Sequence, residues 1–377
     1  MIRYLLGRVL MILGILLLVP ILIALIFREP FRDTLSFLAS SGISLGVGYL
    51  LSFRKPKNED IYAQEGLVMV ALAWFAMSFF GALPFVFSAS VPSLVDALFE
   101  SFSGFTTTGA SVLYSSLHIM PKSLLFWRSF TLLIGGMGML VFLIQVLPTI
   151  GAKGIYIMRA ELPGPNFGKL ESKVSSSVLI LNAIIIGMTL VLVVALKLCG
   201  IPWFDSVLLA LGTAGTGGFD FFPNSVAHYG NPAAEIVLTV GMFTFAMSYL
   251  FFYLIFTGKI KQVLKSEELH WYLAIILISI LFISLNVFPL YENISTMFRD
   301  VSFTVTSVMS TTAYRSVNFN VWPVVTHVVL LFLMFSGGMS GSTSSGLKVA
   351  RIAVFVKSIR QEMRRMVSPD RAVPIKY

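Results

Sequence analysis

The chain alternates between long apolar stretches without charge and shorter polar connections. Eight stretches of 19 to 32 residues contain no Asp, Glu, Lys or Arg: 9–27, 34–53, 66–95, 129–152, 174–196, 236–258, 269–291 and 316–347. A helix needs about 20 mainly apolar residues to cross the hydrocarbon core of a bilayer. The pattern therefore predicts an all-α polytopic membrane protein with eight membrane-spanning helices.

The basic residues predict how these helices are oriented. If the N-terminus lies inside and the eight stretches alternate in direction, 20 of the 27 Lys and Arg residues fall on the inner side. Inner connections of membrane proteins carry such an excess of positive charge. We therefore expect both termini to be cytoplasmic. The outer segments hold about nine acidic residues against seven basic ones, which makes a surface that mildly attracts cations.

Composition supports the membrane class and excludes others. Hydrophobic residues make up 56% of the chain and charged residues 12%, whereas a soluble domain has about 25% charged residues. The single cysteine, Cys199, excludes an intramolecular disulfide. The four histidines lie far apart, without the spacing of metal ligands, and no His/Asp/Glu cluster falls inside the apolar stretches. An enzyme is therefore not expected.

Three of the outer connections share an unusual pattern. Each has a short apolar segment followed by a turn rich in Thr and Gly, within residues 94–110, 204–219 and 298–314. Apolar segments of 10–14 residues are too short to cross a bilayer and are typical of re-entrant elements. The three turns align as Thr107-Thr108-Gly109, Thr216-Gly217-Gly218 and Thr311-Thr312-Ala313, at separations of 109 and 95 residues.

The spacing predicts an internal repeat of about 100 residues, with the form helix, re-entrant P-loop, helix. A second marker supports it, because Gly-Gly-Met occurs at 135–137 and again at 337–339. The expected organisation is two N-terminal transmembrane helices in 1–58, pore repeats in 59–152, 153–266 and 267–358, and a basic cytoplasmic tail in 359–377.

The turns have the composition of a site for an unhydrated cation. Irregular backbone at membrane depth is tolerated where it lines a cavity or is buried in protein. Glycine allows the chain to turn so that successive carbonyl oxygens face one axis, and rings of carbonyls replace the hydration shell of alkali cations. We therefore predict that all nine aligned residues form a metal-ion filter. Close helix packing is the alternative for a single Gly/Thr-rich segment, and the three copies argue against it.

Two segments resemble a known family. The segments TTTGAS at 106–111 and GGMSGSTSSGLK at 337–348 are similar to the first filter and the intramembrane gate loop of the Trk/Ktr/HKT superfamily of potassium transporters, most closely the bacterial TrkH-type subunit. The resemblance implies channel-like potassium uptake in a bacterial inner membrane, with potassium as the transported ion and no cofactor. It implies a gate loop formed by Gly337, Gly338, Gly341, Ser342, Thr343 and Gly346.

The resemblance also implies partners. Besides membrane lipid, these are a second copy of the chain in a homodimer and a cytoplasmic TrkA-type nucleotide-binding regulatory subunit, with no nucleic acid. The basic stretch 348–376 fits either that subunit or anionic lipid headgroups. The sequence GSTSSGLK at 341–348 differs from a nucleotide-binding P-loop, because its lysine comes one place late and no Ser or Thr follows it.

Two departures from the family pattern leave alternatives open. The family has four repeats and this chain carries three, so we expect the fourth repeat to be absent. Ala313 stands where the family usually has glycine, which leaves the choice between potassium and sodium open. A non-conducting, truncated or assembly-only membrane subunit is the alternative function. Five outer acids either attract cations to the pore entrance or act as helix caps and solvated charges: Asp96, Glu100, Asp205, Asp220 and Asp300.

Overall fold

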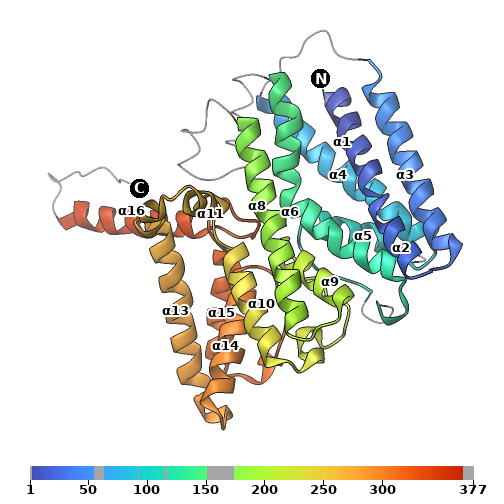
Figure 1. The fold of residues 1–377 in the computed structure, drawn as a ribbon. Coiled ribbons are helices and arrows are strands. Elements are labelled where there is room, and N and C mark those ends of the chain that lie inside the picture. The colour runs from blue at the N-terminus through green and yellow to red at the C-terminus, as the bar shows by residue number, and fades with distance from the viewer. Residues whose placement is uncertain (1, 55–62, 92, 114–116, 151–173, 368–377) are drawn as a thin grey trace.

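The computed structural model describes residues 2–54, 63–91, 93–113, 117–150 and 174–367, and all regular secondary structure in these ranges is helical (Figure 1). The all-α class predicted from the apolar stretches is confirmed. The inner connection at 153–173 and the end of the expected tail lie outside the described residues.

Three helices begin the chain, and the first and third of them form a tightly packed antiparallel pair. They are α1 (Ile2–Leu16), α2 (Val19–Ile26) and α3 (Phe31–Ser52). A Cβ atom added to Gly7 would lie 2.5 Å from the carbonyl oxygen of Gly48, so the backbones of α1 and α3 are in direct contact. Such contacts between small residues are a common way for helices to associate in membranes, where the hydrophobic effect does not drive them together.

The rest of the chain repeats one arrangement three times: a long helix, a short helix, a turn, and a return helix. The first unit has α4 (Ala63–Phe87), α5 (Leu94–Phe105), η1 (Leu117–Ile119) and α6 (Lys122–Ile150). The second has α8 (Val174–Leu198), α9 (Trp203–Ala214), η4 (Ser225–Tyr229), α10 (Pro232–Phe245), α11 (Tyr249–Phe256) and α12 (Ile260–Leu264). The third has α13 (Glu267–Val287), η5 (Phe288–Leu290), α14 (Ile294–Met309), η6 (Phe319–Val321), α15 (Val324–Ser336) and α16 (Val349–Val367).

Five helices among the described residues are long and apolar enough to cross a membrane, counting α1 and α2 as one. The single membrane-spanning helix expected at 236–258 is instead the pair α10 and α11, which meet at an angle of 91°. The reason lies in the hydrogen bonds at the break. The amide of Met339 donates to the carbonyl of Ala246 (2.9 Å), and the amide of Tyr249 donates to the carbonyl of Gly341 (3.1 Å), so a distant loop replaces the helical partners.

The stretch at 316–347 was also expected to form one membrane-spanning helix, and it does not. Its only α-helical segment is Val324–Ser336, after the 3-10 helix Phe319–Val321, and residues 337–348 form the loop that enters the α10–α11 break. Beyond this loop, α16 runs from Val349 to Val367 and therefore continues across the expected boundary at 358.

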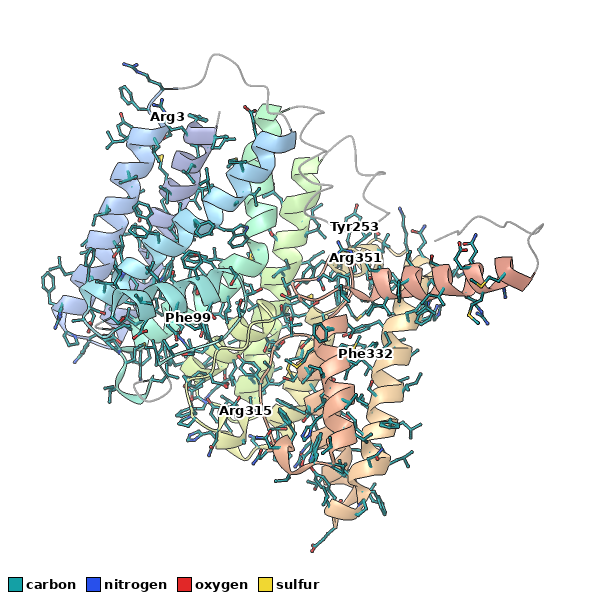
Figure 2. All side chains as sticks on the ribbon, turned by 180° about the vertical axis from the view of Figure 1, so that it is seen from behind. Arg3, Phe99, Tyr253, Arg315, Phe332 and Arg351 are labelled. Carbon is teal, nitrogen blue, oxygen red and sulfur yellow. The ribbon has the colours of Figure 1, made fainter. Side chains whose placement is uncertain are left out.

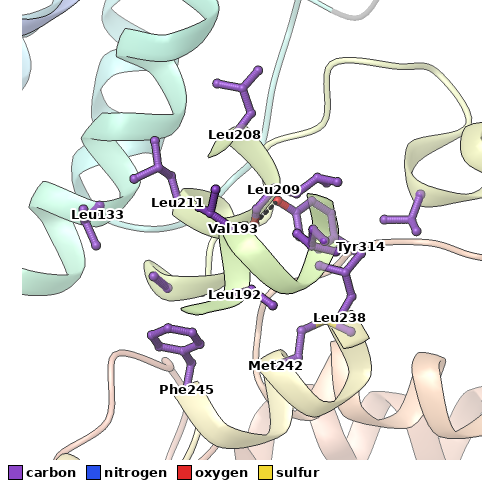
Figure 3. Close-up of a cluster of buried hydrophobic side chains, with 14 of the residues drawn as sticks. Leu133, Leu192, Val193, Leu208, Leu209, Leu211, Leu238, Met242, Phe245 and Tyr314 are labelled. Carbon is purple, nitrogen blue, oxygen red and sulfur yellow. Dashed lines mark hydrogen bonds between the residues drawn. The ribbon is translucent and has the colours of Figure 1, made fainter. Parts of the chain in front are cut away.

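The short helix α9 lies at the centre of the largest hydrophobic cluster (Figure 3). All residues from Leu208 to Ala214 are buried, and α9 packs against Leu192 of α8 and Leu238 of α10. A helix that is apolar on all sides is stable only when it is enclosed. The position of α9 places the turn that follows it deep inside the protein.

Candidate functional site

The three aligned turns have the same backbone conformation. In each, the first and third residues have positive φ angles: 55° and 71° at Thr107 and Gly109, 51° and 58° at Thr216 and Gly218, and 62° and 61° at Thr311 and Ala313. Positive φ is uncommon for a β-branched residue such as threonine. Its recurrence at three threonines indicates a conformation that the surrounding structure imposes.

The hydrogen bonds that impose it are also repeated. In each turn, two successive amides donate to one carbonyl near the end of the preceding short helix, namely Ser103, Gly212 or Ser307. The donors are Thr108 (2.9 Å) and Gly109 (3.3 Å), Gly217 (3.2 Å) and Gly218 (3.2 Å), and Thr312 (3.1 Å) and Ala313 (3.2 Å). In a planar trans peptide the N–H and C=O groups point in opposite directions. The carbonyls of the first two residues of every turn therefore point away from their own helix.

The turns contact one another through backbone atoms. A Cβ atom on Gly109 would lie 1.5 Å from the carbonyl oxygen of Gly217, and one on Gly218 would lie 1.6 Å from the carbonyl oxygen of Thr312. The first turn thus packs on the second and the second on the third. The residues from Thr216 to Gly218 are buried between their neighbours, whereas Ala313 is exposed. A side chain fits at position 313 because this position is not enclosed in the same way.

Serine side chains close two of the turns, a role that sequence reasoning missed. The hydroxyl of Ser103 donates to the carbonyl of Ala110 (2.6 Å), and that of Ser307 donates to the carbonyl of Tyr314 (2.7 Å). The second unit has Gly212 at this place, and the Tyr314 hydroxyl fills the space and donates to the carbonyl of Leu209 (3.2 Å) (Figure 3). The sequence did contain a signal for this role, because in two units a serine lies six residues before the last residue of the turn.

A buried ion pair joins the outer connections of the first and second units. The Nε atom of Arg128 donates to Glu100 at 2.8 Å, and both side chains are at most 2% exposed. Glu100 also accepts from the amide of Val112 (2.8 Å), beyond the first turn. The Arg128 guanidinium lies 3.8 Å from the ring centre of Phe219, beyond the second turn. The roles predicted for Glu100 from the sequence were attracting cations, capping a helix or carrying a solvated charge, and all three were therefore wrong.

Asp205 was one of the acids expected to cap a helix, but the structure gives it a different partner. Asp205 lies in the first turn of α9, but it accepts a hydrogen bond from the Tyr229 hydroxyl (2.9 Å) and does not cap the helix, which begins after Pro202. Asp220 lies two residues beyond Gly218 and accepts from the Ser225 hydroxyl (2.6 Å). Burial raises the pKa of the Asp220 carboxyl to about 6, while that hydrogen bond and the charges of Arg128 and Arg315 oppose the shift.

Residues 337–348, which we call the inner loop, connect α15 to α16. The two ends of this loop lie side by side, and we call this part its neck. At its neck, the amide of Leu347 donates to the carbonyl of Phe335 (2.9 Å), and the amide of Val349 donates to that of Gly338 (3.1 Å). A Cβ atom on Gly337 would lie 2.0 Å from the carbonyl oxygen of Ser345, so the two strands of the neck touch. All six residues expected in a gate loop lie in this one element.

The inner loop is bonded to the start of two turns. The Thr343 hydroxyl donates to the carbonyl of Ala214 (3.0 Å), directly before the second turn, and lies 3.0 Å from the Tyr249 hydroxyl. The amide of Ser345 donates to the hydroxyl of Thr311 (3.0 Å), the first residue of the third turn. The loop therefore lies against the start of the second and third turns.

Two charged residues hold the inner loop in place, Glu268 from outside the loop and Lys348 from within it. Glu268, at the start of α13, accepts from the amide of Ser340 (2.6 Å), and the buried ammonium group of Lys348 donates to the carbonyl of Ser344. Among the described residues there is no group of three or more His, Cys, Asp or Glu side chains that could hold a metal ion. The oxygen atoms at the turns belong to the backbone and to threonine.

Comparison with known proteins extends the similarity over the whole chain. The TrkH family model, described as a cation transport protein, matches residues 36–376. The chain is 30% identical, over its full length, to the Trk system potassium uptake protein TrkH of Halomonas elongata and covers 78% of that protein. It is 31% identical to the protein of that name from Escherichia coli K12, over 95% of this chain and 75% of the relative.

A solved structure has the same fold. The crystal structure of the potassium transporter TrkH from Vibrio parahaemolyticus matches with a TM-score of 0.88 and 28% identity. The match covers all of this chain and 78% of that one. The two proteins therefore share one fold.

Substituting Gly218 by alanine tests the contact between the second and third turns. The added Cβ would overlap the carbonyl oxygen of Thr312 and would also require positive φ at a residue with a side chain. We expect a loss of roughly 2–4 kcal/mol of stability, measured as a lower midpoint of thermal unfolding in detergent.

The matched control is Gly187→Ala, because a Cβ atom there meets nothing within 4 Å. This variant should unfold at about the same temperature as the parent chain. Equal midpoints for both variants would contradict the close packing of the turns.

Proposed function

Because the chain belongs to the TrkH family of cation transport proteins, we propose that it takes up potassium through a pathway lined by the backbone carbonyls of its three turns. The proposal rests on one observation above all. Three turns with the same φ pattern and the same paired amide bonds pack against one another through backbone atoms.

The chemistry of these oxygens suits a monovalent cation. Carbonyl dipoles carry no net charge, so they can replace the water around potassium and still release the ion. The short helices α5, α9 and α14 end at the turns, and the C-terminal end of a helix carries a partial negative charge. The printed names of the relatives from Halomonas elongata and Escherichia coli specify potassium uptake, which supports the choice of ion.

We propose that the inner loop is the gate of this pathway. It is bonded to Ala214 and Thr311 at the start of two turns, where it would obstruct an ion leaving the carbonyls. Its hydrogen bonds reach Ala246 and Tyr249 at the α10–α11 break as well. A movement at that break would therefore be transmitted to the loop.

The remaining parts of the proposal follow the family. The protein would lie in a bacterial inner membrane with both termini cytoplasmic, form a homodimer and bind a TrkA-type nucleotide-binding subunit. The positive-inside distribution of Lys and Arg supports this orientation. A non-conducting subunit is the competing function, and it predicts no ion flux under any condition.

Flux into proteoliposomes tests the central proposal. Purified chain in vesicles should admit rubidium, as a substitute for potassium, faster than vesicles without protein. Gly218→Ala should reduce the flux at least tenfold, whereas Gly187→Ala should retain it. Absence of flux from the correctly folded parent chain would support the non-conducting alternative.

Replacing Thr343 by valine tests the gate. Valine keeps the shape of threonine but loses the hydrogen bonds to Ala214 and Tyr249. Each hydrogen bond of this kind contributes about 1 kcal/mol. Losing both should let the loop leave the turns more often and should raise rubidium flux about thirtyfold.

Thr257→Val is the control for the gate, because the hydroxyl of this exposed residue bonds only to carbonyls of its own helix. Its flux should equal that of the parent chain. An unchanged flux in a folded Thr343→Val protein would exclude the loop as the barrier.

The pKa of Asp220 predicts a pH dependence. Above a pH of about 6 its carboxylate is charged and adds a negative charge two residues beyond the second turn. Influx should therefore fall as the external pH is lowered through about 6. Asp220→Asn should have a low influx without this step, whereas Glu292→Gln, an exposed outer acid, should retain the step. A step that persists in Asp220→Asn would assign it to another group.

A further inference from the structure

The helix that follows the inner loop is strongly amphipathic. Along α16, the apolar residues recur every three or four positions and share one face: Ile352, Phe355, Val356, Ile359, Met363 and Met366. The polar side carries Arg351, Lys357, Arg360 and Arg364. A basic helix with one apolar face and little overall hydrophobicity is typical of helices that lie in a membrane surface.

The apolar face of α16 is not covered by the described part of the chain. Phe355 is 65% exposed, Met363 62% and Met366 84%. Figure 1 shows that α16 lies across the end of α13 and extends away from the bundle. The helix therefore presents a row of large apolar side chains outside the protein core.

The position of α16 along the bundle is fixed by an ion pair. The ammonium group of Lys357 lies 2.6 Å from the carboxylate of Glu267, the first residue of α13. Since α13 is long and apolar enough to cross a membrane, its first residue marks a membrane surface. In Figure 2, Arg351 lies beside Tyr253 at this end of the third unit, and Arg315 lies toward the opposite end.

The same end is rich in exposed bases. The short helix α12, directly before α13, is flanked by Lys259 and Lys265 and contains Lys261. All three lysines are exposed. Arg360 and Arg364 of α16 are exposed as well. Acidic lipid headgroups attract such residues with about 1 kcal/mol per Lys or Arg, whereas acyl chains would cover the apolar face.

We propose that α16 is embedded in the inner membrane surface, with its apolar face among the acyl chains and its bases on anionic phospholipid headgroups. A membrane fits better than a soluble protein, because the uncovered face continues to Met366 at the level where a spanning helix begins. Within the proposed function, this attachment would also fix the C-terminal end of the inner loop, because the amide of Val349, the first residue of α16, donates to the carbonyl of Gly338 in the loop.

Fluorescence in vesicles tests the location of α16 without requiring ion flux, so its failure is distinct from failure of the proposed transport. In a Cys199→Ser background, Met363→Cys on the apolar face and Ser358→Cys on the charged side each receive an environment-sensitive label. In vesicles of phosphatidylcholine and phosphatidylglycerol, lipids with brominated acyl chains should quench the label at 363 at least threefold more than the label at 358. Equal quenching at the two positions would overturn the proposal.

Charge removal tests the headgroup contacts. Arg360→Gln/Arg364→Gln should reduce the ratio of embedded to free helix about thirtyfold in anionic vesicles. The matched control is Arg3→Gln/Arg8→Gln, which removes the same charge from exposed positions in α1 and should leave quenching at 363 unchanged. High salt should weaken embedding of the parent chain, which gives a second measurement if the double variant does not fold.

The test also separates the competing occupants. Quenching that is the same in neutral and anionic vesicles would overturn the headgroup contacts. If the label at 363 remained in water in vesicles and entered an apolar environment only after a cytoplasmic protein was added, the membrane location would be overturned in favour of a protein partner.

Discussion

The structure depends on direct contact between the backbones of three turns. Gly109 lies against the carbonyl of Gly217, and Gly218 lies against that of Thr312. Neither contact leaves room for a Cβ atom. Because the turns approach this closely, carbonyl oxygens from segments about 100 residues apart are brought together. The repeated bonds to Ser103, Gly212 and Ser307 then fix the direction of those oxygens.

The helices around the turns are shaped to allow this approach. In α6, a Cβ on Gly135 would lie 2.1 Å from the carbonyl oxygen of Phe105, and one on Gly136 would lie 3.2 Å from the Cα atom of Gly215. The recurring Gly-Gly-Met sequence therefore has different uses in its two copies. In the first it admits the ends of two short helices, and in the second it begins the inner loop.

Buried polar groups in this region join elements that apolar packing alone would leave independent. The Glu100–Arg128 pair connects the segments that follow the first two turns. Removing one partner of such a buried pair typically costs 3–5 kcal/mol, because the other charge remains buried. The inner loop and the α10–α11 break satisfy one another's backbone groups in a similar way. Irregular backbone inside a membrane is stable only when such partners exist.

The sequence by itself determined the all-helical membrane class, the unit of about 100 residues and the position of the nine turn residues. These features depend on local composition and regular spacing, which can be read along one chain. The positive φ at Ala313 could not be predicted in this way, because alanine disfavours it and only the surrounding hydrogen bonds require it.

Only the tertiary structure decided which turns touch, that Glu100 is buried with Arg128, and that α10 bends into α11. It also placed the Tyr314 hydroxyl in the space left by Gly212. Each of these depends on a contact between residues 28 to 108 positions apart. Such contacts follow from how complete units pack together, and no local pattern of apolar and polar residues specifies that packing.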